Sequence, residues 1–564
     1  MMPRLRQAWD PARLLWLALA GILALLVILP LAQLLLISLE MPGHAGSYTL
    51  ANYVRAFSRE RYLIGFKNSF ILGASVATFC LLLAVPMAWA VARTNMPGKQ
   101  LVRIMVLLTF ITPPFLGATS WVLLASPNAG WLNRFIVWIA GTDSGPFNIY
   151  SFPGLVFVIG IYSIPYSFVF ATAALELVSS EMEEAANILG AGRFITTFRV
   201  TLPLITPAML GAWIITFLEA ISIIGSSVIV ALPARINLVP LQLWQFFGYP
   251  LQVEVAAAYS LPLLLLTVAM FWLQRRLLNR KGYVALTGKG GARQPMDLGR
   301  GRWIALAFCL FVVTLAVVLP YLVLGQAAFS TAWARGFGGD NLTLENFRQL
   351  LIRQSHLKQS IINTFTYSAA AATIAGILAL ATGYLIERQL VPLRGLLSTL
   401  CLAPFVIPGL VLAIGFYAAY APPPLLLGGT ATILILAFTT RFLPIAFTNA
   451  TAAIRGLNPE MEDAVRILGG GRFTVLGRVV APILKRNIAA VWLLVFIASS
   501  REVSSALFLY GPATRTMSVM FFDLTEGAQF EQLAALGLIM AVTTIAFVGI
   551  GQAIAGRDFM LRRN

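Results

Sequence analysis

The residues able to do metal or thiol chemistry are few in this chain, and none forms a cluster. The only two histidines, His44 and His356, lie far apart in short polar segments, where we expect solvated loop residues. The three cysteines, Cys80, Cys309 and Cys401, stand singly within apolar runs, a spacing that fits neither a disulfide framework nor a zinc site. We therefore predict no metal site, and we expect the cysteines to be small packing residues.

An ATP site would need a phosphate-binding loop, in which backbone amides and a lysine hold the phosphates. Such a loop has the form Gly-x4-Gly-Lys-Ser/Thr. The nearest segment here is Gly282-x5-Gly288-Lys289-Gly290, where the glycine spacing is wrong and no hydroxyl follows the lysine. We predict that the chain itself has no ATP site, binds no cofactor and is not an enzyme.

Four charged residues lie in strongly apolar surroundings: Glu219, Arg441, Arg501 and Glu502. A charge inside a bilayer is costly, so such residues usually face a cavity or an oppositely charged partner. One hypothesis is that the four line or gate a path through the membrane. The alternative is that they form structural ion pairs that brace the protein.

The chain as a whole has the composition of a membrane protein. Of its 564 residues, 59% are hydrophobic and only 11% are charged, whereas a soluble domain has about 25% charged residues. Runs of about 20 apolar residues can each cross a bilayer as a helix. We predict an all-α polytopic protein with twelve spans, at about 14–38, 67–92, 103–125, 153–176, 203–231, 256–274, 303–328, 361–386, 396–420, 427–453, 482–508 and 531–555.

Prolines interrupt the third span of each half, at Pro113-Pro114 and at Pro404-x3-Pro408. Proline donates no amide hydrogen and its ring blocks the preceding helical turn. We therefore expect both spans to be broken or kinked. The breaks either shape a cavity or serve packing alone.

The basic residues follow membrane topology rather than a nucleic-acid surface. The formal net charge is +18, with 40 lysines and arginines. If the N-terminus is cytosolic, 27 of them fall in cytosolic segments and 11 in outside segments, which is the positive-inside pattern. We predict a multi-pass protein of the bacterial inner (plasma) membrane with both termini cytoplasmic, in contact with lipid and not with nucleic acid.

The chain also contains a duplication. Residues 181–203 read EMEEAANILGAGRFITTFRVTLP and residues 460–482 read EMEDAVRILGGGRFTVLGRVVAP, with 13 of 23 positions identical at an offset of 279. Further matches flank these loops: Asn52 with Asn346, Asn68 with Asn363, Arg93 with Arg388, and Trp213 with Trp492. The charges are not duplicated, because Arg441, Glu219 and Glu502 align with Tyr162, Ala498 and Ile223.

Each half holds six predicted spans, an even number, so the halves cross the membrane in the same orientation as a parallel repeat. We predict a first half over 1–274 with its loop at 179–203, and a second half over 303–564 with its loop at 458–482. A basic linker, 275–302, joins them, and its glycine content indicates a flexible cytosolic tether.

Each loop predicts two short helices joined by a glycine turn. Asn458 can cap the first helix of the second copy, with Pro459 at its first position, and Ser179 is the equivalent cap in the first copy. Gly190 and Gly469 end that helix, because glycine adopts a positive φ easily. The alanines and apolar residues suit insertion into a groove of another protein, whereas the alternative is an amphipathic helix lying on lipid.

The loop sequence carries a family resemblance. Glu184-Ala185-Ala186-x3-Gly190-x9-Val200-x-Leu202-Pro203 resembles the EAA loop of ABC importer permeases. The second copy keeps the pattern with Asp463 in place of the glutamate, so the resemblance covers the chain as two fused permease halves of the type I importer fold. It implies a coupling helix that docks on a cytosolic ATPase. The implied docking residues are Glu184, Ala185, Ala186, Gly190, Arg193, Asp463, Ala464, Gly469 and Arg472.

The resemblance implies an importer in which two ABC ATPase subunits bind ATP and Mg, and an extracytoplasmic (periplasmic) binding protein delivers the cargo. Residues 501–505, 509–512 and 533–537 most resemble the iron(III)-type permeases. Similar fused permeases serve thiamine, polyamines, phosphonates and sugar phosphates. A twelve-span secondary transporter is the competing class, and it would not need paired loops.

Overall fold

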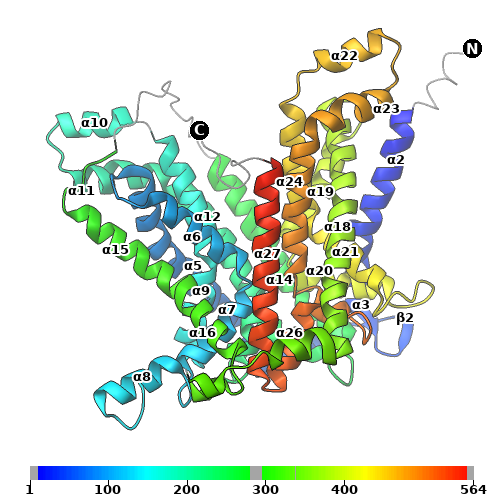
Figure 1. The fold of residues 1–564 in the computed structure, drawn as a ribbon. Helices are drawn as coiled ribbons and strands as arrows, with labels where there is room; N and C mark the ends of the chain where they lie inside the picture. Colours follow the sequence, from blue (N-terminus) through cyan, green and yellow to red (C-terminus); the bar gives the residue numbers. More distant parts are fainter. Residues whose placement is uncertain (1–10, 179, 280–294, 337, 556–564) are drawn as a thin grey trace, which may run out of the picture. The chain divides into compact units, whose positions relative to one another are not determined.

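The structure is a computed structural model that describes residues 11–178, 180–279, 295–336 and 338–555. These residues are almost wholly helical (Figure 1). The described strands, β1 (Glu40–Met41) and β2 (His44–Tyr48), pair as one small antiparallel hairpin. The prediction of an all-α membrane protein is confirmed. The cap candidate Ser179 and most of the predicted linker lie outside the described residues.

Ten described helices are long and apolar enough to cross a membrane. Two pairs of shorter helices also pass this test when each pair is taken together, which gives up to twelve spans. The pairs are α6 (Lys99–Ile111) with α7 (Pro114–Ala125), bent by 99°, and α19 (Arg394–Val406) with α20 (Gly409–Tyr420), bent by 113°. The twelve predicted spans are recovered when each bent pair counts as one.

The bends lie where proline predicts them. Helix α7 restarts at Pro114, and α20 restarts directly after Pro408, whereas Pro404 lies within α19. Bends of 99° and 113° separate each pair into two distinct helices and are more than kinks. The predicted breaks are therefore confirmed, and they are larger than a single missing hydrogen bond requires.

Four of the prolines that lie within continuous spans follow a wider helical turn. Pro30, Pro203, Pro320 and Pro482 each follow a five-residue π-helical turn: η1 (Ala24–Ile28), η2 (Thr197–Thr201), η4 (Thr314–Val318) and η8 (Leu476–Val480). A proline ring clashes with the carbonyl four residues earlier in an α-helix. The wider π turn accommodates it, so these spans continue without a break.

The fifth predicted spans of each half were too long. Helix α12 (Leu202–Ser222) ends nine residues before the predicted boundary at 231, and α24 (Ala481–Ser500) ends eight before 508. The residues that follow are apolar because they are buried in loops, so hydropathy alone does not mark the helix ends. Arg501 and Glu502 consequently lie just past α24 and not within a spanning helix.

The chain divides into two compact units whose borders do not follow the two halves of the sequence. Unit 1 contains residues 1–56, 246–264 and 347–564, and unit 2 contains residues 57–245 and 265–346. The first span of each half therefore belongs to the unit formed mainly by the other half. These exchanged spans are α2 (Pro11–Leu23) with α3 (Leu29–Leu39), and α15 (Gly301–Val313) with α16 (Leu319–Ala328).

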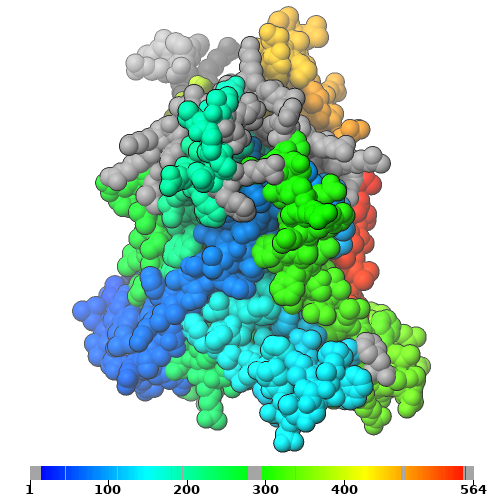
Figure 2. Space-filling view, turned by 90° about the vertical axis from the view of Figure 1, so that its left-hand side faces the viewer, coloured from blue at the N-terminus to red at the C-terminus, as the bar shows by residue number. Residues whose placement is uncertain are grey.

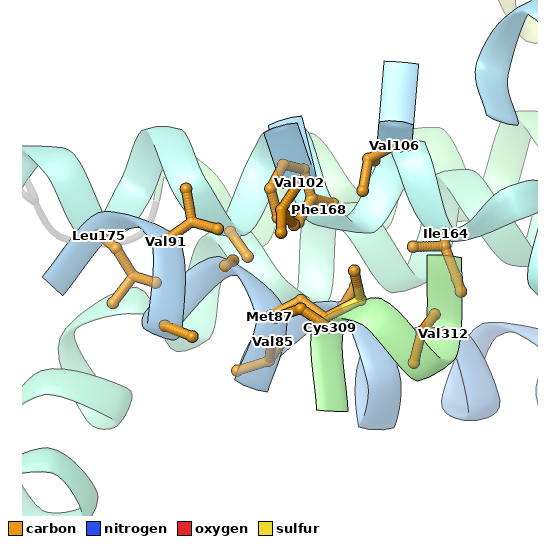
Figure 3. Packing of buried hydrophobic residues seen from close by; sticks show 14 of the residues in the cluster. Val85, Met87, Val91, Val102, Val106, Ile164, Phe168, Leu175, Cys309 and Val312 are labelled. Atoms are coloured by element: carbon orange, nitrogen blue, oxygen red, sulfur yellow. The ribbon is translucent and has the colours of Figure 1, made fainter. Parts of the chain in front are cut away.

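Unit 2 is built around one long helix, α5 (Glu60–Arg93). Its other helices include α8 (Trp131–Ala140), α9 (Phe152–Leu177), α10 (Ser180–Ile188), α11 (Arg193–Thr196) and most of α13 (Val239–Phe246). Short turns are η3 (Ser227–Ala231), η5 (Trp333–Arg335) and η6 (Gly339–Asn341). Helices α5, α6, α9 and α15 enclose an apolar core that includes Met87, Phe168 and Cys309 (Figure 3).

Unit 1 has the equivalent long helix, α18 (Ser355–Glu387). Its other helices are α4 (Ala51–Ser58), which crosses the border, α21 (Ala431–Arg455), α22 (Glu460–Ile467), α23 (Arg472–Val475), α25 (Ala506–Leu509), α26 (Met517–Glu526) and α27 (Phe530–Ala555). Helix α14 (Val253–Asn279) is shared between the units, α17 (Glu345–Arg348) lies at their border, and η7 (Gln349–Arg353) precedes α18. All three cysteines are buried and unbridged, which confirms their predicted packing role.

The exchanged helix α3 approaches α20 of unit 1 at backbone contact. A Cβ atom at Gly415 would lie 2.7 Å from the carbonyl oxygen of Pro30. Nearby, the Tyr420 hydroxyl donates to the carbonyl of Leu25, which belongs to the π turn η1. Glycine at position 415 is thus required by the close approach of two backbones.

We predict that Gly415→Ala destabilises the protein by about 1–3 kcal/mol, because the added methyl group must push α3 away from α20. Thermal unfolding of the purified protein in detergent measures this. Gly376→Ala in α18 is the matched control, since its Cβ meets nothing within 4 Å and alanine favours the helix. Equal unfolding midpoints for the two variants would contradict the close contact.

Candidate functional site: the repeated loops

Each repeated loop forms two short helices around a glycine turn, as predicted. In unit 2, α10 leads through Gly190, with φ of 83°, to α11. In unit 1, α22 leads through Gly469, with φ of 84°, to α23. The backbone amide of Glu460 donates to Asn458 Oδ1 at 3.0 Å, so Asn458 caps α22. Each loop projects at one end of its own unit (Figure 1), and Figure 2 shows the first loop at the surface of unit 2.

The tips of both loops expose apolar side chains to an unusual degree. Ile188 and Leu189 are 86% and 87% exposed, and their counterparts Ile467 and Leu468 are 85% and 87% exposed. Neither pair contributes to the core of its own unit. Leucine at both tips was expected to fill a groove, whereas the isoleucines were not singled out although both copies have them.

The predicted docking residues lie along the same surfaces. Ala185, Gly190, Asp463, Ala464 and Gly469 are exposed, and Ala186 is half-buried. For Glu184, Arg193 and Arg472 the structure describes the backbone but not the side chain. Most of the described members are therefore accessible at the surface of each loop, as the apolar tips are.

Each loop is held by a buried ion pair that the sequence reading missed. In unit 2, Arg93 at the end of α5 pairs with Glu183, and their side chains are 6% and 14% exposed. In unit 1, Arg388 pairs with Glu462 at 2.7 Å, with side chains 12% and 4% exposed. We call these two contacts the loop ion pairs. The repeat contained the information needed to predict these pairs, because both the arginines and the glutamates align.

The same arginines also bind the end of the fourth span. Arg93 donates to the carbonyl of Val178 at 3.1 Å, directly after α9. Arg388 donates to the carbonyl of Leu457 at 3.2 Å, directly after α21. A cation is favourable there because the carbonyls at a helix C-terminus are unpaired and carry partial negative charge. Each arginine thus joins the long helix, the fourth span and the loop at one point.

The two glutamates receive a second donor from different places. In unit 2 the Thr201 hydroxyl donates to Glu183 at 2.7 Å, whereas the equivalent residue of the second half is Val480. In unit 1 the Tyr384 hydroxyl donates to Glu462 at 2.8 Å, whereas the equivalent residue of the first half is Trp89. Each buried carboxylate therefore has one arginine and one hydroxyl, although the hydroxyl comes from opposite sides of the loop.

Other polar contacts of α5 and α18 are also duplicated. Trp213 donates to the Thr78 hydroxyl at 3.1 Å in unit 2, and Trp492 donates to the Thr373 hydroxyl at 2.9 Å in unit 1. At the opposite end from the loops, the side-chain amides of Asn68 and Asn363 donate to the backbone carbonyls of Asn237 and Arg515, each at 3.0 Å. The long helix of each unit is fixed at its middle and at both ends.

The end of the predicted linker is ordered against α5. The backbone amide of Met296 donates to the carbonyl of Arg93 at 2.8 Å, and the amide of Asn95 donates to the carbonyl of Met296 at 3.0 Å. Asn95 Oδ1 also accepts the amide of Leu298 at 3.0 Å. These residues of the linker, beyond 294, are therefore attached to unit 2 beside its loop ion pair.

The charges predicted to lie in the membrane have local partners. Glu219 in α12 accepts a hydrogen bond from the Tyr166 hydroxyl at 2.9 Å. Arg441 donates to the carbonyl of Ile407 at 2.7 Å, at the break between α19 and α20. Glu502 accepts the backbone amide of Ser505 at 2.9 Å. Arg501 and these three side chains are all half-buried.

No group of three or more histidine, cysteine, aspartate or glutamate residues is placed to hold a metal ion within the described ranges. The two halves instead repeat a spanning scaffold with a surface loop at one end. This combination defines a polytopic helical membrane protein with a repeated surface loop.

Comparison with known proteins defines the class further. Residues 81–283 match the family described as "Binding-protein-dependent transport system inner membrane component". The ferric transport system permease protein FbpB of Actinobacillus pleuropneumoniae is 25% identical over 500 residues, which cover 88% of this chain and 70% of that protein. A putative ferric transport system permease protein FbpB 1 of Haemophilus influenzae is 26% identical over 84% of this chain and 73% of its own length.

A shorter relative matches about half of the chain. The spermidine/putrescine transport system permease protein PotC of Haemophilus influenzae is 24% identical over 44% of this chain and 95% of its own length. These matches confirm the resemblance to ABC importer permeases, and this chain is similar to ferric transport permeases across both of its halves. It is a multi-pass protein of the inner membrane.

We predict that Arg388→Met destabilises unit 1 by about 3–5 kcal/mol, because it leaves Glu462 buried without its cation. Thermal unfolding and limited proteolysis of the second loop measure this. Arg455→Met is the control, since Arg455 pairs with Glu387 but is 74% exposed. Adding Glu462→Met to Arg388→Met should recover most of the loss. If Arg388→Met behaves like Arg455→Met, the ion pair does not hold the loop.

The different hydroxyl donors to Glu183 and Glu462 allow a second test of how these carboxylates are held. Tyr384→Phe should cost about 1.5–3 kcal/mol, because Glu462 loses a hydrogen bond to a charged group. Val480→Thr in the same chain should restore much of that loss by supplying the hydroxyl that Thr201 supplies in the first half. Unfolding midpoints of the single and double variants measure the coupling. Additive effects would show that the two positions do not serve the same carboxylate.

Proposed function

We propose that this chain is a membrane-spanning part of an ATP-driven importer for ferric iron, with two permease halves in one chain. Two cytosolic ABC ATPase subunits dock on the two repeated loops, and an extracytoplasmic binding protein delivers the cargo. The observation that carries the proposal is the pair of loop tips, each nearly 90% exposed and apolar, mounted on a buried ion pair. An exposed apolar pair on a rigid base is suited to a groove on another protein.

The orientation follows from the distribution of charge. In each unit the proposed cytosolic side is the end that bears the loop, because the sequence segments on that side of the predicted topology carry most of the lysines and arginines, in accord with the positive-inside rule. Helix α5, with 34 residues, is about 51 Å long and exceeds the membrane thickness, so its two ends reach both aqueous sides. Arg93 then marks the cytosolic end, and Asn68 lies toward the outside.

The loop ion pairs give the importer a means of transmitting force. When the ATPase subunits close on ATP, each loop moves with the subunit on which it is docked. Because Arg93 or Arg388 joins the loop to the long helix and to the fourth span, those helices move with the loop. A change in the ATPase dimer thereby changes the packing of the spanning helices and opens the path to the other side. ATP and Mg are bound by the ATPase partners in this proposal.

The relatives support iron as the cargo. Permeases named for ferric transport match across both halves, over 84–88% of the chain, whereas the spermidine/putrescine permease matches 44%. Polyamines are therefore the second candidate cargo, ahead of thiamine, phosphonates and sugar phosphates. A secondary transporter is disfavoured because its mechanism gives no role to duplicated apolar tips.

The four membrane charges divide in this proposal. Arg441 and Glu502 are occupied by backbone groups at the helix break and at the start of α25, which supports a bracing role. Glu219, which also accepts a hydrogen bond from Tyr166, and Arg501 are proposed to face the path because each is half-buried and present in one half only. The electrostatic asymmetry of the path would follow from their presence in one half only.

We predict that the double variant Leu189→Asp with Leu468→Asp abolishes co-purification of the ATPase and reduces transport about tenfold or more, because a charge enters the apolar contact of each loop. Pull-down with the partner ATPase and uptake in proteoliposomes measure this. Leu344→Asp, at a residue that is 68% exposed in a different segment, is the matched control. Retention of the ATPase by the double variant would contradict the docking assignment.

The cargo is tested separately. Proteoliposomes that contain the permease, its ATPase and the binding protein should take up radiolabelled iron from the ferric form of the binding protein, and only with ATP. Uptake of spermidine under the same conditions would replace iron with the second candidate. Uptake driven by an ion gradient without ATPase would contradict the importer mechanism itself.

A further inference from the structure

A cavity of about 380 Å³ opens in unit 2 at the end of the molecule opposite the repeated loop. Arg61 lines it from the first turn of α5, about 48 Å along that helix from Arg93. The remaining lining comes from residues 232–245, which follow α12, and the volume is in the range of small-molecule sites. That this end faces the outside rests on the proposed function, whereas the chemistry of the cavity does not.

The polar lining consists of cations and amides without any carboxylate. Arg61 and Arg235 contribute two guanidinium groups, and Asn237, Gln242 and Gln245 contribute amides. Arg61 donates to Gln245 Oε1 at 2.6 Å, which is a neutral partner and leaves its charge uncompensated. Neither arginine forms an ion pair with any described residue. The cavity is therefore electropositive.

Two further residues shape the cavity. Gln242 is only 7% exposed and lines the cavity. Its side-chain amide can donate hydrogen bonds to a bound ligand. Arg235 has a φ of 55°, a left-handed conformation that is uncommon outside glycine.

The backbone beneath these residues is fixed. Ser69 accepts the amide of Val239 at 2.9 Å, and Asn68 donates to the carbonyl of Asn237 at 3.0 Å. The amide of Ile236 donates to the carbonyl of Ala231 at 2.9 Å. The cavity is thus preformed.

The equivalent region of the second half contains a carboxylate that the first half lacks. Thr364 accepts the amide of Met517 at 2.7 Å, just as Ser69 accepts Val239, and this aligns Gln245 with Asp523. Asp523 pairs with Arg515 at 3.3 Å and also interacts electrostatically with His356, which stands at the position of Arg61. In the second half the carboxylate of Asp523 therefore balances the positive charge of this region. In the first half Gln245 stands at that position and carries no charge.

We propose that this cavity binds a small oxyanion, a carboxylate or phosphate group of a free solute. The anion takes the place that Asp523 fills in the second half. The guanidinium groups of Arg61 and Arg235 suit the planar or tetrahedral oxygens of such a ligand, and the Gln242 amide completes its hydrogen bonds. The concave volume fits a molecule rather than a flat protein surface.

The test is equilibrium binding of radiolabelled inorganic phosphate, with citrate as competitor, to the purified full-length chain in detergent without added lipid. Wild type should bind phosphate saturably. Arg235→Gln and Gln245→Asp should each weaken binding about tenfold or more, the first by removing a charged donor and the second by supplying the internal carboxylate of the other half. Arg335→Gln, at an exposed arginine elsewhere in unit 2, should bind as wild type does.

Unfolding midpoints equal to wild type show that the variants are folded. Absence of saturable binding to wild type, or equal binding by all variants, would overturn the proposal. Loss of binding-protein docking in Arg235→Gln without any free-anion binding would also overturn it and assign the arginines to protein contact. Because the assay needs neither ATPase nor transport, its outcome is independent of the importer proposal.

Discussion

Two buried guanidinium groups, those of Arg93 and Arg388, each join the long helix of their unit to its loop and to the end of its fourth span. Each pairs with a loop glutamate and donates to a carbonyl at the end of the fourth span. Because removing one charge would leave the other buried and unpaired, the contact cannot be given up cheaply while the loop moves. A loop with an exposed apolar tip is thereby joined to a helix long enough to cross the membrane.

Duplication preserved these contacts more faithfully than it preserved the sequence. The arginine, the glutamate and the tryptophan–threonine bond recur in both units. The second donor to the glutamate comes from Thr201 in one unit and from Tyr384 in the other, so the requirement was kept while its source changed. The contacts at the opposite end from the loops differ more between the halves. Asp523 of the second half aligns with Gln245 of the first, so the arginines near Gln245 have no carboxylate at that position.

Much of the architecture follows from the sequence because apolar length, proline and glycine act locally. Span number, the breaks at Pro113-Pro114 and Pro408, and the turns at Gly190 and Gly469 were all predictable. The ends of α12 and α24 were not, because the buried loops after them are as apolar as the spans. The exchange of first spans between units was also hidden, since hydropathy carries no information on partners. The loop ion pairs could have been predicted from the repeat, because their arginines and glutamates align in both halves.

The central claim is that each loop and its long helix move together. Spin labels at Met461, an exposed residue of α22 beside Glu462, and at Ile377, an exposed residue of α18, measure this by pulsed electron resonance. The native cysteines are buried, so labels go to the introduced sites. With the ATPase bound, the account predicts the same distance before and after ATP addition, and a changed or broadened distance when Glu462→Gln weakens the ion pair. A distance that changes with ATP in the otherwise unaltered protein would contradict the account.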